Sequence, residues 1–189
     1  LGLLASNNTN MRIGSGAYGY TRELPQVDCD PLRFRPADLW GCAAAQIFSS
    51  VSPAMHEEFA LQYERRWLER FGLSYYGCCE PLHEKINLLE SVANLRKVSV
   101  SPWADLPRAA EAISHRYVLS LKPNPSLLAK DRFIQEEARN ALEEALTAAK
   151  RYGCRVEIVL KDISTVRREP GRLFQWAEIA EETCRRIYG

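Results

Sequence analysis

From about residue 46 onward, short apolar runs alternate strictly with longer stretches of helical periodicity. Five pairs of strand and helix follow one another, with strands expected at residues 46–51, 73–76, 97–101, 117–121 and 156–160. Strict alternation predicts an α/β protein with a parallel sheet, because each helix returns the chain to the end of the sheet where the next strand starts.

The expected helices are marked by apolar residues that recur every three or four positions. The clearest helix follows a Ser52 cap, begins at Pro53 and ends at Gly72. Its predicted buried face consists of Met55, Phe59, Tyr63, Trp67 and Phe71. The next helix is expected from Pro81, with an inner face of Leu82, Ile86 and Leu89. Later helices are expected to start at Asp105, at about Arg132 and at Pro170.

Five such units after a less regular segment allow two architectures. The sheet is either open and doubly wound, or it belongs to the C-terminal part of a (β/α)8 TIM barrel, which takes ~250 residues when complete. The run Leu1–Leu4 resembles the end of a helix and favours the partial barrel. We therefore expect a helix end and an irregular lid over residues 1–45, and about five β/α units of a barrel over residues 46–189.

Charge balance, hydropathy and cysteine spacing limit the kinds of partner that the chain is expected to bind. The 25 lysines and arginines nearly balance the 24 aspartates and glutamates, so a formal net charge of +1 gives no reason to expect nucleic acid. No apolar run approaches the ~20 residues of a membrane span, and no signal peptide is visible. The six cysteines lack the spacing of a secreted disulfide scaffold. These features predict a cytoplasmic protein with free thiols and without a membrane partner.

The densest group of reactive side chains follows the second expected strand, where parallel α/β proteins bind substrates and metals. Cys78, Cys79, Glu80 and His83 fall within six residues of one another. Thiolate, carboxylate and imidazole are all zinc ligands, so Cys78 or Cys79 with Glu80 and His83 could hold a zinc ion with one open position. Alternatively, Glu80 caps the helix, His83 bonds within the wall and the thiols only pack.

Polar side chains also follow the later strands, and we expect them to line the same edge of the sheet. The candidates for substrate binding are Trp103, Asp105, Lys122, Asn124 and Lys161. A lysine ends each of the last two strands, which indicates either an anionic substrate or an ion pair with Asp162. Trp103 could stack on a flat ligand or pack in the wall.

Three motifs occur in an order that resembles one known superfamily. They are Tyr76-Gly-Cys-Cys-Glu-Pro-Leu-His83, Val98-Ser-Val-Ser-Pro-Trp-Ala-Asp-Leu106 and Lys122-Pro-Asn-Pro-Ser-Leu-Leu128. Together they resemble the uroporphyrinogen decarboxylase superfamily, which includes corrinoid-linked and cobalamin-independent methyltransferases, and in particular an uncharacterised decarboxylase-like branch. The resemblance covers roughly residues 40–187 and implies the last five strands or so of a (β/α)8 barrel.

The motifs depart from the superfamily's known sites. In its zinc methyltransferases a His-x-Cys pair ends the corresponding strand and a second cysteine ends the last one. Here Cys78 matches the first cysteine, Tyr76 replaces the histidine, and no cysteine lies in residues 160–165. The decarboxylase proper uses a histidine near the last strand, where this chain has Lys161 and Asp162.

The resemblance and the loop residues together give three candidate functions, in order of preference. The first is methyl transfer through a metal-bound thiolate, with zinc on Cys78, Glu80 and His83 and a corrinoid on a partner protein. We assign catalytic roles to Glu80, His83 and Asp162. The second is decarboxylation of a carboxylated small molecule or a tetrapyrrole, with the lysines binding the acid. The third is a non-catalytic partial barrel that associates, for example as a homo-oligomer.

Overall fold

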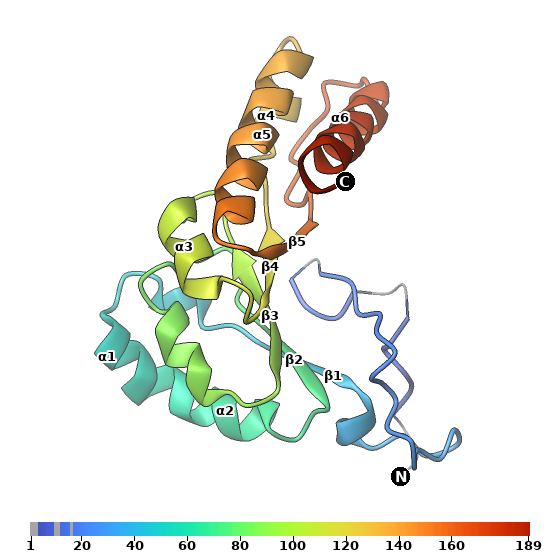
Figure 1. The fold of residues 1–189 in the computed structure, drawn as a ribbon, viewed down its shortest axis with the longest axis vertical. Helices are drawn as coiled ribbons and strands as arrows, with labels where there is room; N and C mark the ends of the chain where they lie inside the picture. Colours follow the sequence, from blue (N-terminus) through green and yellow to red (C-terminus); the bar gives the residue numbers. More distant parts are fainter. Residues whose placement is uncertain (1–3, 10–11, 16) are drawn as a thin grey trace.

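The five strands form one parallel sheet in which every strand pairs with its neighbour along the chain. The computed structural model describes residues 4–9, 12–15 and 17–189. The strands are β1 (Trp40–Ala43), β2 (Leu73–Tyr76), β3 (Leu95–Val100), β4 (Val118–Leu121) and β5 (Arg155–Ile158). Their order across the sheet is β1-β2-β3-β4-β5, and all four pairings are parallel (Figure 1).

This sequential order confirms the α/β class and the parallel sheet. A doubly wound sheet reverses its strand order at a switch point, and this sheet has no such reversal. The arrangement is compatible with part of a β/α barrel. Closure into an eight-stranded TIM barrel stays a prediction.

The connections between the strands are helical, and several are short. The α-helices are α1 (Pro53–His56), α2 (Gln62–Leu68), α3 (Leu106–Ile113), α4 (Ser126–Ala129), α5 (Gln135–Arg151) and α6 (Gly171–Tyr188). A π-helical turn, η3 (Glu57–Leu61), joins α1 to α2. The 3-10 turns are η1 (Pro36–Asp38), η2 (Gln46–Phe48) and η4 (Ile86–Ser91). Among the residues described, none of these helices combines the length and apolar character needed to cross a bilayer.

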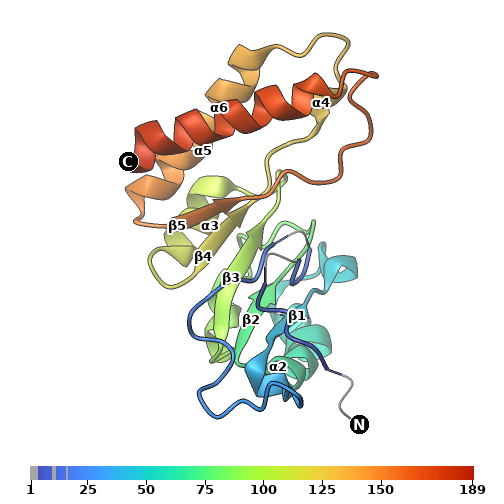
Figure 2. The same cartoon turned by 90° about the vertical axis from the view of Figure 1, so that its right-hand side faces the viewer.

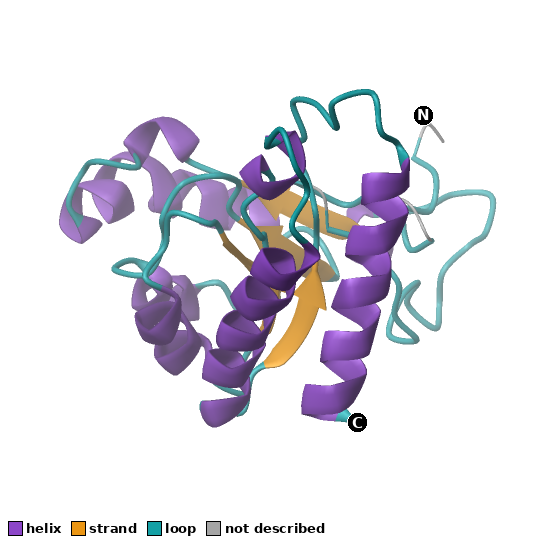
Figure 3. Cartoon of the chain, turned by 90° about the horizontal axis from the view of Figure 1, so that it is seen from above, coloured by secondary structure: helices purple, strands orange, loops and turns teal. Residues whose placement is uncertain are grey.

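One face of the sheet carries the main core. Alternate strand residues such as Tyr76, Val98 and Leu119 are fully buried there against the helices. Figure 3 shows the helices as an arc around one side of the strands. Beyond β5, α5 and α6 lie side by side and share a second core around Leu142 and Trp176 (Figure 2).

The N-terminal segment covers part of the opposite face. Ile13, Ala17 and Leu24 pack against Trp40 and Tyr75 of the sheet. Figure 1 shows this segment on the side of β1 and β2 away from α1 to α3. The N-terminal segment, which was expected to be an irregular lid, therefore covers part of a sheet face in addition to approaching the strand ends. The helix end expected at Leu1–Leu4 lies, apart from Leu4, outside the described residues.

The first expected strand, at residues 46–51, was placed wrongly. Those residues form the turn η2 and an exposed loop, and Ile47 is 91% exposed. The first strand is β1, inside the segment predicted to be irregular. It escapes the pattern because it is only four residues long and includes Gly41. A Cβ on Gly41 would lie 2.5 Å from the ring of Phe71, so the close approach of that ring requires glycine.

The predicted buried face of the first helix was also wrong. Met55, Phe59, Tyr63 and Trp67 are 46–58% exposed. The helix instead turns His56, Ala60, Glu64 and Leu68 toward the sheet. The buried face is therefore displaced by one residue from the expected one, and this displacement is already present at Met55 and His56, before the π-helical turn.

A hydroxyl group beneath the helix explains this rotation. The Tyr76 hydroxyl donates to Glu64 Oε2 at 2.6 Å and lies 2.7 Å from His56 Nε2. The alternative rotation would cover the hydroxyl with apolar side chains and leave it without a partner, which costs about 1–3 kcal/mol. The Ser52 cap was predicted correctly, since its Oγ accepts from the Met55 amide at 3.2 Å.

The helix expected from Pro81 does not form. Residues 81–82 are irregular, residues 83–85 form a turn, and η4 follows. Leu82, Ile86 and Leu89 are nevertheless buried in the main core, as expected for the inner face. The loss of one helical turn changes where Glu80 and His83 point, with consequences for the predicted metal site.

Two glycines with positive φ allow a matched test of the close packing after β2. Gly77 has φ +97°, and a Cβ there would lie 2.6 Å from Leu82 Cδ1 and 2.9 Å from Ser99 Cβ. Gly153 has φ +71° and no atom within 4 Å of such a Cβ. We expect Gly153→Ala to lower the free energy of unfolding by about 1 kcal/mol through backbone strain alone. Gly77→Ala adds the clash and should cost about 3 kcal/mol.

Urea denaturation followed by circular dichroism measures both values. Equal losses for the two variants would show that the loop after β2 is not packed against Leu82 and Ser99.

Candidate functional site

A cavity of about 230 Å³ opens at the carboxyl ends of the strands. Its side chains come from the segments after β2, β3, β4 and β5, which meet at one edge because the strands are parallel. We call it the strand-end cavity, and its lining residues are Cys79, Pro102, Trp103, Lys122, Pro123, Pro125, Lys161 and Asp162. Four predicted site residues, Trp103, Lys122, Lys161 and Asp162, are therefore brought together.

Lys122 is the most deeply buried polar group of this cavity, at 2% exposed. Its Nζ donates to Cys78 O at 2.8 Å and to Ser99 Oγ at 2.5 Å, and it lies 5.6 Å from the Tyr75 ring centroid. Burial, together with the nearby positive charge of Lys161, lowers the pKa of Lys122 to about 8. The amine therefore gives up its proton more readily than an ordinary lysine.

The neighbours of Lys161 shift its pKa in the opposite direction to that of Lys122. Its Nζ lies 2.5 Å from Asp162 Oδ2 and 3.0 Å from Cys79 Sγ. Burial opposes the charged form, but the bonds to Asp162 and Cys79 outweigh it, so the pKa of Lys161 is raised. The bond from Lys161 lowers the pKa of Asp162. The pair is thus an ammonium and a carboxylate at neutral pH. The sequence offered this ion pair with Asp162 as the alternative to an anionic substrate.

Asp162 reaches Lys161 through an uncommon backbone conformation. Its φ is +57°, in the left-handed region that aspartate tolerates better than most residues. Its Oδ2 also accepts from Cys79 Sγ at 3.4 Å. Cys79 has a raised pKa, chiefly because of burial, although Lys161 opposes the shift. The resting form of Cys79 is therefore the thiol.

Cys78 lies beside this group but faces the N-terminal segment. Its Sγ accepts from Ser15 Oγ at 2.8 Å and lies 3.6 Å from Cys79 Sγ. Both cysteines are free thiols in the structure. Ser15 is 63 positions away in sequence, and nothing in its surroundings along the chain predicts this contact.

Glu80 and His83 point away from each other. Glu80 is buried and accepts from the Cys78 amide at 2.8 Å through Oε2, in a bond within the loop. His83 Nδ1 accepts from the Asp105 amide at 3.3 Å, and the ring lines a separate surface hollow with Asn87 and Arg108. The expected helix from Pro81 would have placed the two side chains on one face, whereas the observed turn separates them.

The predicted ligand set of Cys78, Glu80 and His83 is therefore not assembled. Across residues 4–9, 12–15 and 17–189, no three His, Cys, Asp or Glu side chains are grouped so as to hold a metal ion. The donor set does not fit a zinc ion, and the catalytic roles expected of Glu80 and His83 at the cavity are not supported by their positions. Zinc binding itself stays a prediction.

Two expected substrate ligands serve the ends of helices. Asp105 caps α3, where its Oδ1 accepts from the Arg108 amide at 3.1 Å. Asn124 Oδ1 accepts from the Ser126 amide at 2.9 Å at the start of α4. Asn124 also lines a second, largely apolar cavity of about 240 Å³ between α3 and α5. Trp103, at 69% exposed, lies on the rim of the strand-end cavity.

Sequence reasoning gave too little weight to two residues of the site. Cys79 was considered only as a substitute for Cys78, yet it is the thiol that lines the cavity. Ser99 was not singled out, although it is fully buried in β3 and binds Lys122. A polar residue in an apolar strand, between Val98 and Val100, was the available signal for it.

Neither a family model nor a curated protein matches the chain. The resemblance to the uroporphyrinogen decarboxylase superfamily therefore stays a prediction carried by the three motifs.

The pKa of Lys122 is directly measurable. We expect one lysine ¹³Cε resonance in selectively labelled protein to titrate near pH 8 and to vanish in Lys122→Met. In Lys161→Met the Lys122 pKa should rise, because a neighbouring positive charge has been removed. Absence of any lysine titration below pH 9 in the wild type would contradict the burial of this amine.

The same shift predicts a pH dependence of stability. Lys122 loses its proton near pH 8 in the folded chain and near 10.5 when unfolded, so between these values the unfolded state binds more protons. The free energy of unfolding of wild type relative to Lys122→Met should therefore rise from pH 8 to 10.5 and be flat below pH 8. Denaturant titrations of both proteins across this range check the sign.

Proposed function

We propose that the chain is an enzyme whose strand-end cavity binds a small carboxylated molecule, and that its reaction is decarboxylation. The observation that carries the proposal is the pairing of two unlike lysines in one cavity. Lys161 is a fixed cation, and Lys122 is a buried amine with a lowered pKa. A fixed cation suits recognition of an acid, and perturbed lysines in a cleft are typical of functional sites.

Lys161 retains binding capacity despite its ion pair. An ammonium carries three N–H donors, and Cys79 and Asp162 take two of them. The third can donate to the carboxylate of a ligand. Trp103 on the rim offers an apolar surface for the rest of such a molecule.

The size of the cavity favours a small acid over a tetrapyrrole. Its volume of about 230 Å³ is below the roughly 300–1,000 Å³ of pockets that hold drug-sized ligands. A short oxo acid suits a cavity of this smaller volume, and we take short oxo acids as the substrate class.

Methyl transfer through a metal-bound thiolate receives less support from the site. It needs a metal held by Cys78, Glu80 and His83, which do not converge, and the cavity thiol Cys79 has a raised pKa. Metal content measured by mass spectrometry on wild type and Cys78→Ser decides this alternative. Stoichiometric zinc that is lost in the variant would restore methyl transfer, and a corrinoid partner with it.

The proposed reaction is tested by carbon dioxide release from a panel of 2-oxo and 3-oxo acids. We expect release with at least one acid and a KM raised roughly tenfold or more in Lys161→Met, because a charge-assisted bond is worth about 1.5–3 kcal/mol. Lys130→Met is the matched control, since Lys130 is an exposed lysine paired with Glu137 outside the cavity. No release from any acid, or equal effects of the two variants, would refute the proposal.

A further inference from the structure

Lys122 differs from the other cavity lysine in having no carboxylate partner. Among the described residues, its Nζ makes no ion pair, and its hydrogen-bond acceptors are the Cys78 carbonyl and the Ser99 hydroxyl. A buried ammonium without a counter-ion is unfavourable, which favours the neutral amine. In the neutral form the two N–H groups satisfy these two acceptors. The nitrogen lone pair is then left for an electrophile.

The position of Lys122 gives an electrophile access to that lone pair. Lys122, Pro102 and Pro123 line both the strand-end cavity and the apolar cavity between α3 and α5. Lys122 therefore borders both a polar wall, with Lys161 and Asp162, and an apolar wall. A 3-oxo acid, with a carboxylate at one end and a carbonyl carbon separated from it by one carbon atom, would meet both lysines.

We propose that Lys122 is a covalent catalytic residue that forms an imine with the carbonyl carbon of a small oxo acid. This inference rests on the proposed function, because it takes the strand-end cavity as the site of a carboxylated ligand. Its new content is the bond itself: a nitrogen–carbon bond replaces the carbonyl double bond to oxygen, and one water molecule leaves.

The imine supplies what decarboxylation of a 3-oxo acid requires. When the carbon–carbon bond to the carboxylate breaks, carbon dioxide leaves and the electron pair moves through the adjacent carbon to the protonated imine nitrogen, which gives an enamine. A proton then adds to carbon, and water hydrolyses the imine to return the amine and the ketone. No oxidant or reductant is consumed. Asp162 and Cys79 lie in the same cavity and can move the protons.

Two other lysines that are partly or fully buried, Lys161 and Lys85, each lack either a free lone pair or access to the strand-end cavity. Lys161 lines the cavity, but its ion pair with Asp162 keeps it protonated and without a lone pair. Lys85 is buried and its pKa is lowered by burial, but its Nζ binds the carbonyls of Phe48 and Ser49 and it lines neither cavity. Lys85 is thus a matched control for burial without access.

Borohydride trapping of the full chain tests the imine directly. Protein incubated with acetoacetate or with pyruvate and then reduced should gain one adduct, found by peptide mass spectrometry on the peptide containing Lys122. Lys122→Met should abolish the adduct, Lys85→Met should leave it unchanged, and Lys161→Met should reduce its yield severalfold. Because the wild-type adduct is located by peptide mapping, the result does not depend on the folding of Lys122→Met.

The outcomes separate this inference from the proposed function. An adduct confined to Lys122 supports the imine, even where no carbon dioxide is released, in which case decarboxylation alone fails. Carbon dioxide release without an adduct on Lys122 leaves the decarboxylase standing and overturns the imine. Adducts spread over the exposed lysines, or no adduct with either acid, also overturn it.

Discussion

The strand ends are held together by one buried amine. Lys122 follows β4, and its Nζ binds the carbonyl of Cys78 after β2 and the hydroxyl of Ser99 in β3. Ser99 in turn donates to the same carbonyl at 2.6 Å. Three neighbouring strands are thus joined at the edge where the cavity opens. Burying this nitrogen is unfavourable unless it is bonded or neutral, so the packing that closes the strand ends also sets the chemistry of the amine.

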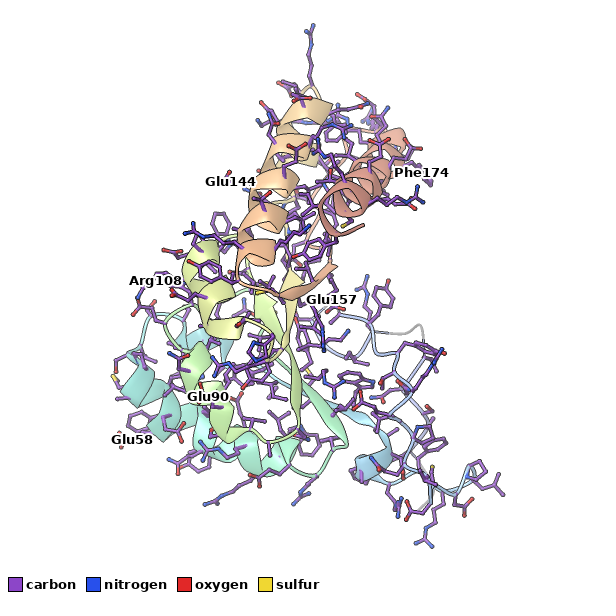
Figure 4. The ribbon with its side chains drawn as sticks, viewed as in Figure 1. Glu58, Glu90, Arg108, Glu144, Glu157 and Phe174 are labelled. Carbon is purple, nitrogen blue, oxygen red and sulfur yellow. The ribbon has the colours of Figure 1, made fainter. Side chains whose placement is uncertain are left out.

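The two faces of the sheet differ in character, as expected for a singly wound arrangement. The helix-covered face is apolar, whereas the other carries Ser99, Ser120 and an ion pair between Lys97 Nζ and Glu157 Oε2 at 2.6 Å. Figure 4 labels Glu157 on β5. The N-terminal segment contacts this second face through the Tyr18 carbonyl, which accepts from Lys97 at 2.7 Å, and through apolar packing on Trp40 and Tyr75. A polar, partly covered inner face is compatible with part of a barrel, whose interior is normally enclosed by strands on all sides.

Local patterns predicted the later strands and the cavity edge, because short apolar runs and the residues that end them can be recognised in short stretches of sequence. The lysines and Asp162 were found in this way. Two predictions were wrong because they depended on contacts between distant residues. The rotation of the first helix is set by the Tyr76 hydroxyl, 20 positions from His56, and the choice of Cys79 over Cys78 by Lys161, 82 positions away. Such bonds leave no periodic signal in the sequence. The helix expected at Pro81 is a separate error. It was inferred from apolar spacing that a 3-10 turn satisfies equally well.

The two cavity lysines differ because a different residue follows each of them in the sequence. Each ends a strand region after a leucine, in Leu121-Lys122-Pro123 and Leu160-Lys161-Asp162. Asp162 turns back through its positive φ to pair with the lysine before it. Pro123 has no carboxylate to pair with Lys122. It also disfavours a helical backbone conformation at Lys122, so the backbone there continues the extended course of β4. Similar local sequences therefore give one lysine that is paired with a carboxylate and one that is not. The proposed reaction, which must both hold an acid and attack its carbonyl carbon, uses one of each.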